Sequence, residues 1–265
     1  MFTLELIILG LLTGIITGLT GASGVLVLVP ILSTFSDIPL PIILGTSLFV
    51  DVIACIPVSY AYAKAKNLDV KSVGWIIAGA LLGAQIGSYF VVSVSKSLIM
   101  GIISIGMIYF GIKMWQSGFS KEKELSIRIP ERLSFYMKTQ VGMILSGLLI
   151  GLTTGIFGAG GGLTVFIILF SFLNFPLKKA IGTSSFVMLI TALSGVLGYF
   201  GNDNLHFSYG IILGISAFIG GALSSTIANK MPEKRLSRFI GVFFVSLAII
   251  VIFLKVIIPV FKIEM

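Results

Sequence analysis

Two glycine-rich stretches, "GLTGASGVL" (18–26) and "GIFGAGGGLT" (155–164), interrupt long apolar segments of this chain. Glycine inside a helix weakens it by about 1 kcal/mol relative to alanine, so these stretches predict that one helix ends and another begins. The start of a helix presents free backbone N–H groups and a partial positive charge, and glycine lets an anion approach them. We therefore expect an anion to bind at Gly21, Ala22, Ser23, Gly24, Gly158, Ala159, Gly160, Gly161 and Gly162.

Hydroxyl side chains follow each glycine-rich stretch in a repeated Gly-Thr-Ser sequence. Thr46 and Ser47 belong to the first copy, and Thr183, Ser184 and Ser185 to the second. Their O–H groups could donate hydrogen bonds to the same anion. The alternative is that they bond to the preceding turn of their own helices, as Ser and Thr often do inside helices.

The composition places these residues in a membrane. The chain has 57% hydrophobic and 11% charged residues and a mean hydropathy of +1.12, more apolar surface than a 28.3 kDa globule could bury. Glu5 stands where a signal peptide would be basic, so we expect the first apolar run to be retained. Windows of roughly 20 apolar residues predict membrane spans. They lie at 39–63, 72–93, 97–116, 180–200, 207–228 and 236–254.

Two longer apolar stretches, 3–36 and 139–173, exceed the bilayer thickness as straight helices, since a helix rises about 1.5 Å per residue. Each must bend, and each has its glycine cluster near the middle. We expect each to be a hairpin of two helices.

The chain is an internal duplication. Residues 10–51 align without a gap on 147–188, with 20 identities in 42 positions. We expect a first membrane repeat at 1–115, a cytoplasmic linker at 116–138 and a second repeat at 139–265. The predicted fold is all-α and polytopic, with two five-segment units that each contain a broken hairpin and three full transmembrane helices.

The basic residues predict how the repeats face the membrane, because Lys and Arg in short loops stay cytoplasmic. With the linker inside, 15 of the 18 basic residues fall on the cytoplasmic side. This requires the hairpins to enter from opposite faces, which makes the duplication an inverted repeat, a pattern typical of transporters with a site near the midplane. The net charge of +8 is then mostly a topology signal and does not predict nucleic-acid binding.

Departures from the repeat mark two further candidates. Asp51 is the only acidic residue deep inside a predicted full span, and its counterpart is Met188. A carboxylate there costs several kcal/mol unless it is paired, solvated or protonated. It is a candidate for proton coupling, or alternatively a protonated acid bonded to nearby backbone or to Gln85, the other deep polar side chain.

The motifs "GLTGASGVLVLVP" and "GIFGAGGGLTVFI", each followed by a proline and then by "GTS", resemble the TauE/SafE permeases. The resemblance covers essentially the whole chain. It implies a multi-pass carrier of the prokaryotic cytoplasmic membrane that moves sulfite, organosulfonates or related sulfur anions.

The predicted function is a secondary transporter, with an anion channel as the alternative. An enzyme is not expected, since His, Cys and carboxylate residues do not cluster at membrane depth. Cys55 and His206 are single, so we expect neither a metal site nor a cofactor. The expected partners are a small anionic substrate and membrane lipid, without nucleic acid. The sequence leaves open homo-oligomer formation, the direction of transport and the coupling ion.

Overall fold

The computed structural model describes residues 3–90, 108, 112, 115–116, 139–157 and 160–252, and all regular structure in these ranges is helical. Five helical segments are long and apolar enough to cross a membrane, so the protein is a multi-pass membrane protein. These segments are Thr3–Thr20, Leu40–Lys64, Lys71–Tyr89, Leu177–Phe200 and Phe207–Lys230. The last four confirm expected spans, whereas Thr3–Thr20 was expected only as one arm of a hairpin. Most of the span expected at 97–116 and of the linker lies outside the described residues.

The helices follow the duplicated sequence in the same order in each half. The first half contains α1 (Thr3–Thr20), α2 (Val25–Phe35), α3 (Leu40–Lys64), the short η1 (Lys71–Val73) and α4 (Gly74–Phe90). The second contains α7 (Gln140–Phe157), α8 (Gly160–Ile167), the π-helical turn η3 (Ile168–Phe172), α9 (Leu177–Phe200), α10 (Phe207–Lys230) and α11 (Glu233–Ile252).

Each long apolar stretch is divided where the glycines predicted a break. After α1 the chain turns back, since Gly24 lies against the side chain and carbonyl of Thr13 in the preceding helix. In the second half Gly161 lies against the side chain of Thr154 in the same manner. Both stretches are therefore helical hairpins, α1–α2 and α7–α8.

The outer helices of the two halves exchange partners. Helix α1 packs on α10 of the second half, and α7 packs on α4 of the first. Small residues allow this close contact: a Cβ added at Gly10 would stand 2.5 Å from the Leu213 carbonyl oxygen, and one at Gly155 would stand 2.5 Å from that of Ala84. Glycines recur every four residues on α1, at Gly10, Gly14 and Gly18, and on α7, at Gly147, Gly151 and Gly155. Their small size lets the helix backbones approach closely, as small residues do between membrane helices.

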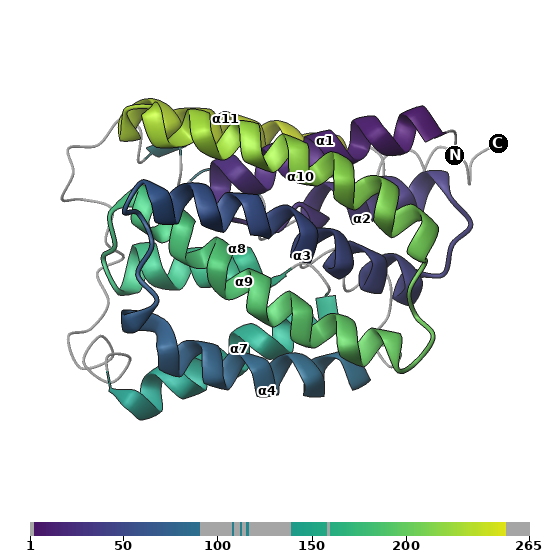
Figure 1. Cartoon of the computed structure of the whole chain (residues 1–265), viewed down its shortest axis with the longest axis horizontal. Helices are drawn as coiled ribbons and strands as arrows, with labels where there is room; N and C mark the ends of the chain where they lie inside the picture. Colours follow the sequence, from purple (N-terminus) through teal and green to yellow (C-terminus); the bar gives the residue numbers. More distant parts are fainter. Residues whose placement is uncertain are drawn as a thin grey trace.

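Helices α3 and α9 lie side by side in the middle of the bundle and run in opposite directions (Figure 1). The loop after α3 reaches the start of α9, where the Asp69 N–H donates to Thr183 Oγ1 at 3.1 Å. The loop after α9 reaches the start of α3, where the His206 N–H donates to Thr46 Oγ1 at 2.9 Å. These two hydrogen bonds correspond when the repeats are aligned, so the halves contact each other through equivalent atoms.

Candidate anion-binding site

The first break in the membrane helices lies between α1 and α2. Gly21 has φ +65, a left-handed conformation that side chains with a Cβ rarely adopt. The Ala22 N–H donates to Thr20 Oγ1 at 3.0 Å, and the Val25 N–H donates to Ser23 Oγ at 3.2 Å. The turn is held by its own hydroxyl groups, and Ala22 and Ser23 are fully buried.

The second break lies between α7 and α8. Gly160, Gly161 and Gly162 form the first turn of α8, whereas Gly158 and Ala159 lie outside the described residues. This glycine turn occupies the place in the second hairpin that Ser23, Gly24 and Val25 occupy in the first.

The two breaks meet inside the bundle. A Cβ added at Gly162 would stand 2.7 Å from the backbone nitrogen of Ser23 and would also overlap the Met188 sulfur. The Ser184 hydroxyl of α9 donates to the Gly21 carbonyl oxygen at 3.0 Å, so the second Gly-Thr-Ser copy touches the first break. The structure thus brings residues of both predicted clusters together in space.

Asp51 lies on α3 beside the first break. Its Oδ2 accepts a hydrogen bond from the Ser23 hydroxyl, and the backbone of Gly24 lies next to the same carboxyl. Both Asp51 and Ser23 are 1% exposed, and Asp51 Oδ1 has no hydrogen-bond partner among the described residues. A buried carboxylate oxygen without a partner is unusual, because such groups nearly always find one.

Comparison with known proteins identifies the family. The model of the sulfite exporter TauE/SafE family matches residues 6–251, nearly the whole chain. This protein belongs to the TauE/SafE family. It is therefore a membrane transporter and not an enzyme.

Several relatives of this TauE/SafE protein are described as probable membrane transporter proteins. YunE of Bacillus subtilis (strain 168) is 28% identical over 249 residues, which cover 86% of this chain and 89% of the relative. A relative from Haemophilus influenzae is 28% identical over 268 residues, covering 94% and 97%. One from Methanocaldococcus jannaschii is 28% identical over 245 residues, covering 87% and 88%. No solved structure matches the chain.

The Gly-Thr-Ser copies of this transporter hold loops of the opposite half. The carbonyl oxygen of Asn204 stands where a Cβ at Gly45 would be, and that of Asn67 stands at Gly182. Thr46 and Thr183 accept the loop N–H groups described above. The duplicated glycine and threonine therefore have a docking role that sequence reasoning missed.

The serines of the two copies differ from each other. Ser47 donates to the Ile43 carbonyl oxygen at 2.6 Å, and Ser185 donates to that of Ile181 at 2.8 Å, each within its own helix. This is the intrahelical alternative for those two residues. Ser184 also reaches Ile181 but adds the bond to Gly21 across the bundle.

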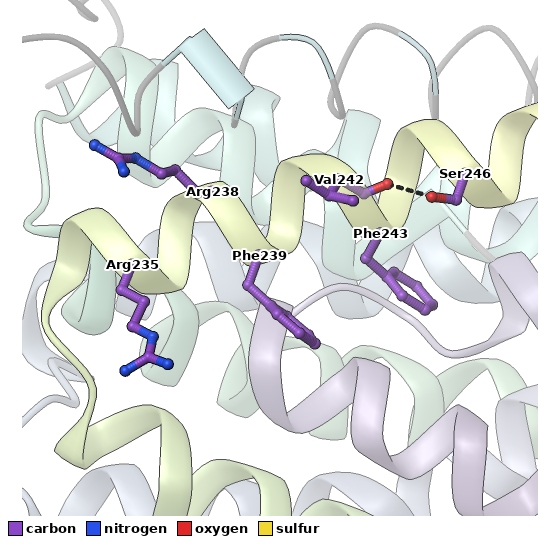
Figure 2. Close-up of a pocket in the computed structure, with 6 residues that line it drawn as sticks. All are labelled: Arg235, Arg238, Phe239, Val242, Phe243 and Ser246. Atoms are coloured by element: carbon purple, nitrogen blue, oxygen red, sulfur yellow. Dashed lines mark hydrogen bonds between the residues drawn. The ribbon is translucent and has the colours of Figure 1, made fainter.

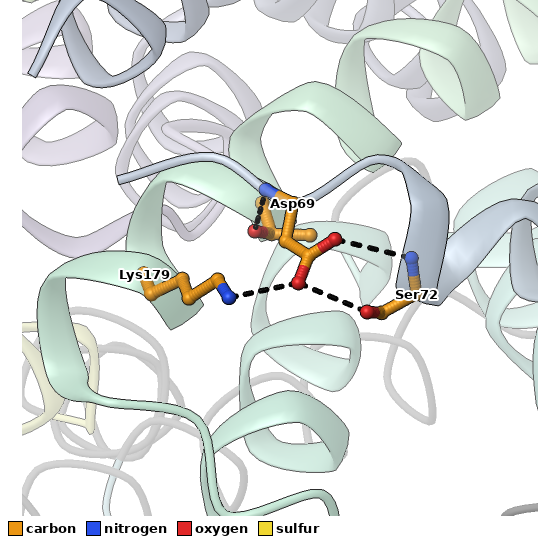
Figure 3. A network of polar contacts seen from close by, with 4 residues as sticks. Asp69, Ser72 and Lys179 are labelled. Atoms are coloured by element: carbon orange, nitrogen blue, oxygen red, sulfur yellow. Dashed lines mark hydrogen bonds and ion pairs between the residues drawn. The ribbon is translucent and has the colours of Figure 1, made fainter. Parts of the chain in front are cut away.

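The loop after α3 has an ion pair that the loop after α9 lacks among the described residues. Lys179 Nζ lies 2.8 Å from Asp69 Oδ2, and Ser72 donates to the same carboxylate through its hydroxyl and its backbone N–H (Figure 3). The hydrogen bond from Lys179 is the main reason that the pKa of Asp69 lies below its ordinary value; the Ser72 bonds act in the same direction, and partial burial opposes them.

The side chain of Gln85 forms hydrogen bonds with Ser194 and none with Asp51. Its Nε2 donates to the Ser194 carbonyl oxygen at 2.5 Å and to the Ser194 hydroxyl at 3.2 Å. It joins α4 to α9, so the alternative in which Gln85 is the partner of Asp51 is wrong: that partner is Ser23.

Two tyrosines next to the breaks were not predicted. Tyr62 donates to the Gly18 carbonyl oxygen at 3.0 Å, and Tyr199 donates to that of Gly155 at 2.8 Å. Each satisfies a carbonyl in the last turn of a helix, where no intrahelical partner exists. The two tyrosines occupy equivalent places in the two repeats, which was a signal in the sequence.

Two hollows on the described structure lie along the outer helices, and Gly21, Ser23, Asp51 and Gly162 line neither of them. One is bordered by residues of α11 that include Arg235, Arg238 and Phe239 (Figure 2). The other runs between α1 and α10 and ends at Phe239. The residues at the meeting point of the breaks are buried instead, with Ser23, Ser184 and Asp51 at most 1% exposed.

Proposed function

We propose that this protein is a secondary carrier for small sulfur-containing anions such as sulfite or organosulfonates. The observation that carries the proposal is the meeting of the two glycine-rich breaks, at Ser23 and Gly162. Broken helices at membrane depth provide backbone N–H groups for an anion in a region without water. The burial of Ser23, Ser184 and Asp51 supports a carrier. A carrier closes its substrate site to each side of the membrane in turn.

The two halves form an inverted repeat in this proposal. Its support is the exchange of equivalent contacts, in which α1 packs on α10 while α7 packs on α4. The opposite directions of α3 and α9, and the matching bonds of Thr46 and Thr183, fit the same relation. Rocking of one half against the other would then expose the breaks to each side alternately.

The basic residues support one orientation of the protein in the membrane. The loop at 65–70 and the starts of α9 and α11 would face the cytoplasm, since Lys64, Lys66, Lys178, Arg235 and Arg238 lie there. The loop at 201–206 would face outward.

Cysteine labelling tests this orientation. A membrane-impermeant maleimide should label Asn202→Cys in intact cells, whereas Ala65→Cys should react only after permeabilisation; both native residues are exposed. The native Cys55 is buried and serves as the background control. Reaction of both positions from outside would contradict the inverted arrangement.

We further propose that Asp51 couples transport to protons. It is a buried carboxyl next to the first break, and one of its oxygens has no partner among the described residues. A group that gains and loses a proton near the bound anion can link the two fluxes. The carboxyl lies in one half only, which is consistent with one proton for each transport cycle.

Flux in liposomes tests the carrier. The purified protein should exchange at least one anion from a panel of sulfite, sulfate, thiosulfate and alkanesulfonates, with saturation and with stimulation by the same anion on the opposite side. Flux that does not saturate and lacks this stimulation would identify a channel. Absence of flux for the whole panel would overturn the proposed substrate class.

A further inference from the structure

We infer that the Ser23 hydroxyl makes anion binding depend on the protonation of Asp51, so that the anion and the proton travel in the same direction. The inference rests on the proposed function and adds the sense of the coupling and the residue that performs it. It starts from the hydrogen bond between Ser23 and Asp51, two residues that lie 28 positions apart and are both buried.

A serine hydroxyl has one hydrogen to donate and two lone pairs with which to accept. In this structure Ser23 accepts from the Val25 N–H at 3.2 Å and donates to Asp51 Oδ2. Its only donor capacity is then used by the carboxylate. With Asp51 ionised, the Ser23 hydroxyl has no hydrogen to donate to an anion at the break.

Protonation of Asp51 reverses this hydrogen bond. A proton added to the carboxylate at Oδ2 can be donated to Ser23 Oγ, which still has a free lone pair beside the one that accepts from Val25. The Ser23 O–H can then turn to an anion held near Gly162, where an added Cβ would stand 2.7 Å from the Ser23 backbone nitrogen. The hydrogen and both lone pairs of the Ser23 hydroxyl are then used.

Charge acts in the same direction as the hydroxyl. An anion and an ionised carboxylate at the same buried place repel each other strongly, since the surroundings screen little. The anion therefore favours the neutral acid. The loaded carrier contains both the anion and the proton, and the cycle carries them across together.

Apart from Cys55, the ionisable groups on α3 and on the helices packed against it lie away from Asp51. The described helices packed against α3 are α1, α2, α9 and α10. Among the ionisable groups of these helices and of α3, Cys55 faces Asp51 from the next turn. The others lie near helix ends or bond elsewhere; they are Glu5, Tyr60, Tyr62, Lys64, Lys178, Lys179, Tyr199, His206, Tyr209 and Lys230.

The second half cannot perform the same exchange. Gly160 stands at the position equivalent to Ser23, and Met188 stands at the position equivalent to Asp51. Neither residue has a proton to exchange or a hydroxyl to turn. The inference therefore predicts one proton for each anion.

The experiment measures anion affinity as a function of pH with thiosulfate and an alkanesulfonate as probes, because both stay ionised while sulfite itself titrates near neutral pH. Wild-type affinity should fall as pH rises, and binding in weak buffer should take up about one proton per anion. Asp51→Asn should keep the acid-pH affinity at every pH and take up no proton, since its amide can donate to Ser23 permanently.

Ser23→Ala separates the relay from a structural role. Its affinity should be roughly tenfold below wild type at acid pH, the loss expected for one hydrogen bond to a charged group. The deficit should disappear at alkaline pH, where the wild-type hydroxyl is held by Asp51. Ser23→Thr, which keeps the hydroxyl, should restore the profile. Ser225→Ala is the control, since Ser225 is a buried serine bonded within α10.

Three outcomes would overturn the inference while leaving the carrier in place: pH-independent affinity in wild type, an equal loss in Ser23→Ala at every pH, or loss of binding in Asp51→Asn at every pH. Uphill uptake driven by a sodium gradient and not by an acid exterior would overturn it as well. Failure of wild type to bind any probe at any pH, together with absence of flux, would instead be failure of the proposed function.

Discussion

The two breaks of this transporter occupy equivalent places in the duplicated sequence, and yet they are built differently. The first has a left-handed glycine at Gly21, a hydroxyl at Ser23 and a carboxyl at Asp51. The second has glycine at position 160 and the apolar Met188 in the places of Ser23 and Asp51. The two similar helix breaks thus differ in their polar groups, and only the first has a buried carboxyl beside it among the described residues.

The loops that close the bundle differ in a similar way. Each docks on a Gly-Thr-Ser copy of the other half through a backbone N–H. Among the described residues, only the Asp69 loop adds an ion pair, with Lys179, whose counterpart in the first half is Ile42.

The largest effect is expected from Gly21→Ala. A side chain at φ +65 is strained by roughly 1–2 kcal/mol, and the added Cβ would stand 2.6 Å from the Ile181 carbonyl oxygen. We expect transport in liposomes to fall more than tenfold and thermal stability to decrease. Gly74→Ala is the matched control, because a Cβ at Gly74 meets nothing within 4 Å. Wild-type transport in Gly21→Ala would show that the first break tolerates an ordinary turn.

The second prediction makes the two breaks alike. Replacing Ser23 by Gly and Asp51 by Met gives the first half the residues of the second. Anion exchange at equal pH should persist, since the backbone donors remain, whereas accumulation driven by a pH gradient should fall to the level of protein-free liposomes. Accumulation equal to wild type would place the coupling outside this pair.

The sequence predicted the helices and the breaks because both depend on local composition. It did not predict partners. The packing of α1 on α10 joins segments that lie far apart in the chain. Hydropathy does not indicate which helices pack against each other. The docking role of Thr46 and Thr183 also depended on where distant loops return.

The pairing of Ser23 with Asp51 was closer to being predictable. Both residues depart from the repeat, with Gly160 and Met188 in the corresponding places. Two polar departures in one half suggest that they act together, but their contact depends on the angle at which the hairpin leaves the break. Gln85 was singled out by its depth alone, and its side chain contacts Ser194 of α9 instead of Asp51.

The third prediction compares the loop acceptors. Thr46→Val removes the acceptor of the His206 N–H, and Thr183→Val removes that of the Asp69 N–H. An N–H left without a partner costs about 1 kcal/mol or more. We expect Thr46→Val to lower the thermal unfolding temperature more than Thr183→Val, because Lys179 and Ser72 still hold the Asp69 loop. Equal shifts would mean that the ion pair adds nothing to docking.

The smallest effect is expected from Lys179→Ile, which gives the second half the residue of its counterpart Ile42. The ion pair is partly exposed, with Lys179 36% and Asp69 21% exposed, so its loss should lower stability by less than about 1 kcal/mol. The stability difference from wild type should shrink in high salt. Lys179→Arg, which keeps the charge, is the matched control.

The pH dependence of this small difference has a definite sign. Because Lys179 lowers the pKa of Asp69, the pair stabilises the folded protein fully at pH values above the ordinary aspartate pKa of about 3.9, and the stabilisation is lost as pH falls through the lowered pKa. Thermal unfolding should therefore show a constant difference between wild type and Lys179→Ile from about pH 5 to 8, and convergence in stronger acid. A difference that changes between pH 5 and 8 would mean that another group titrates at this end of the bundle.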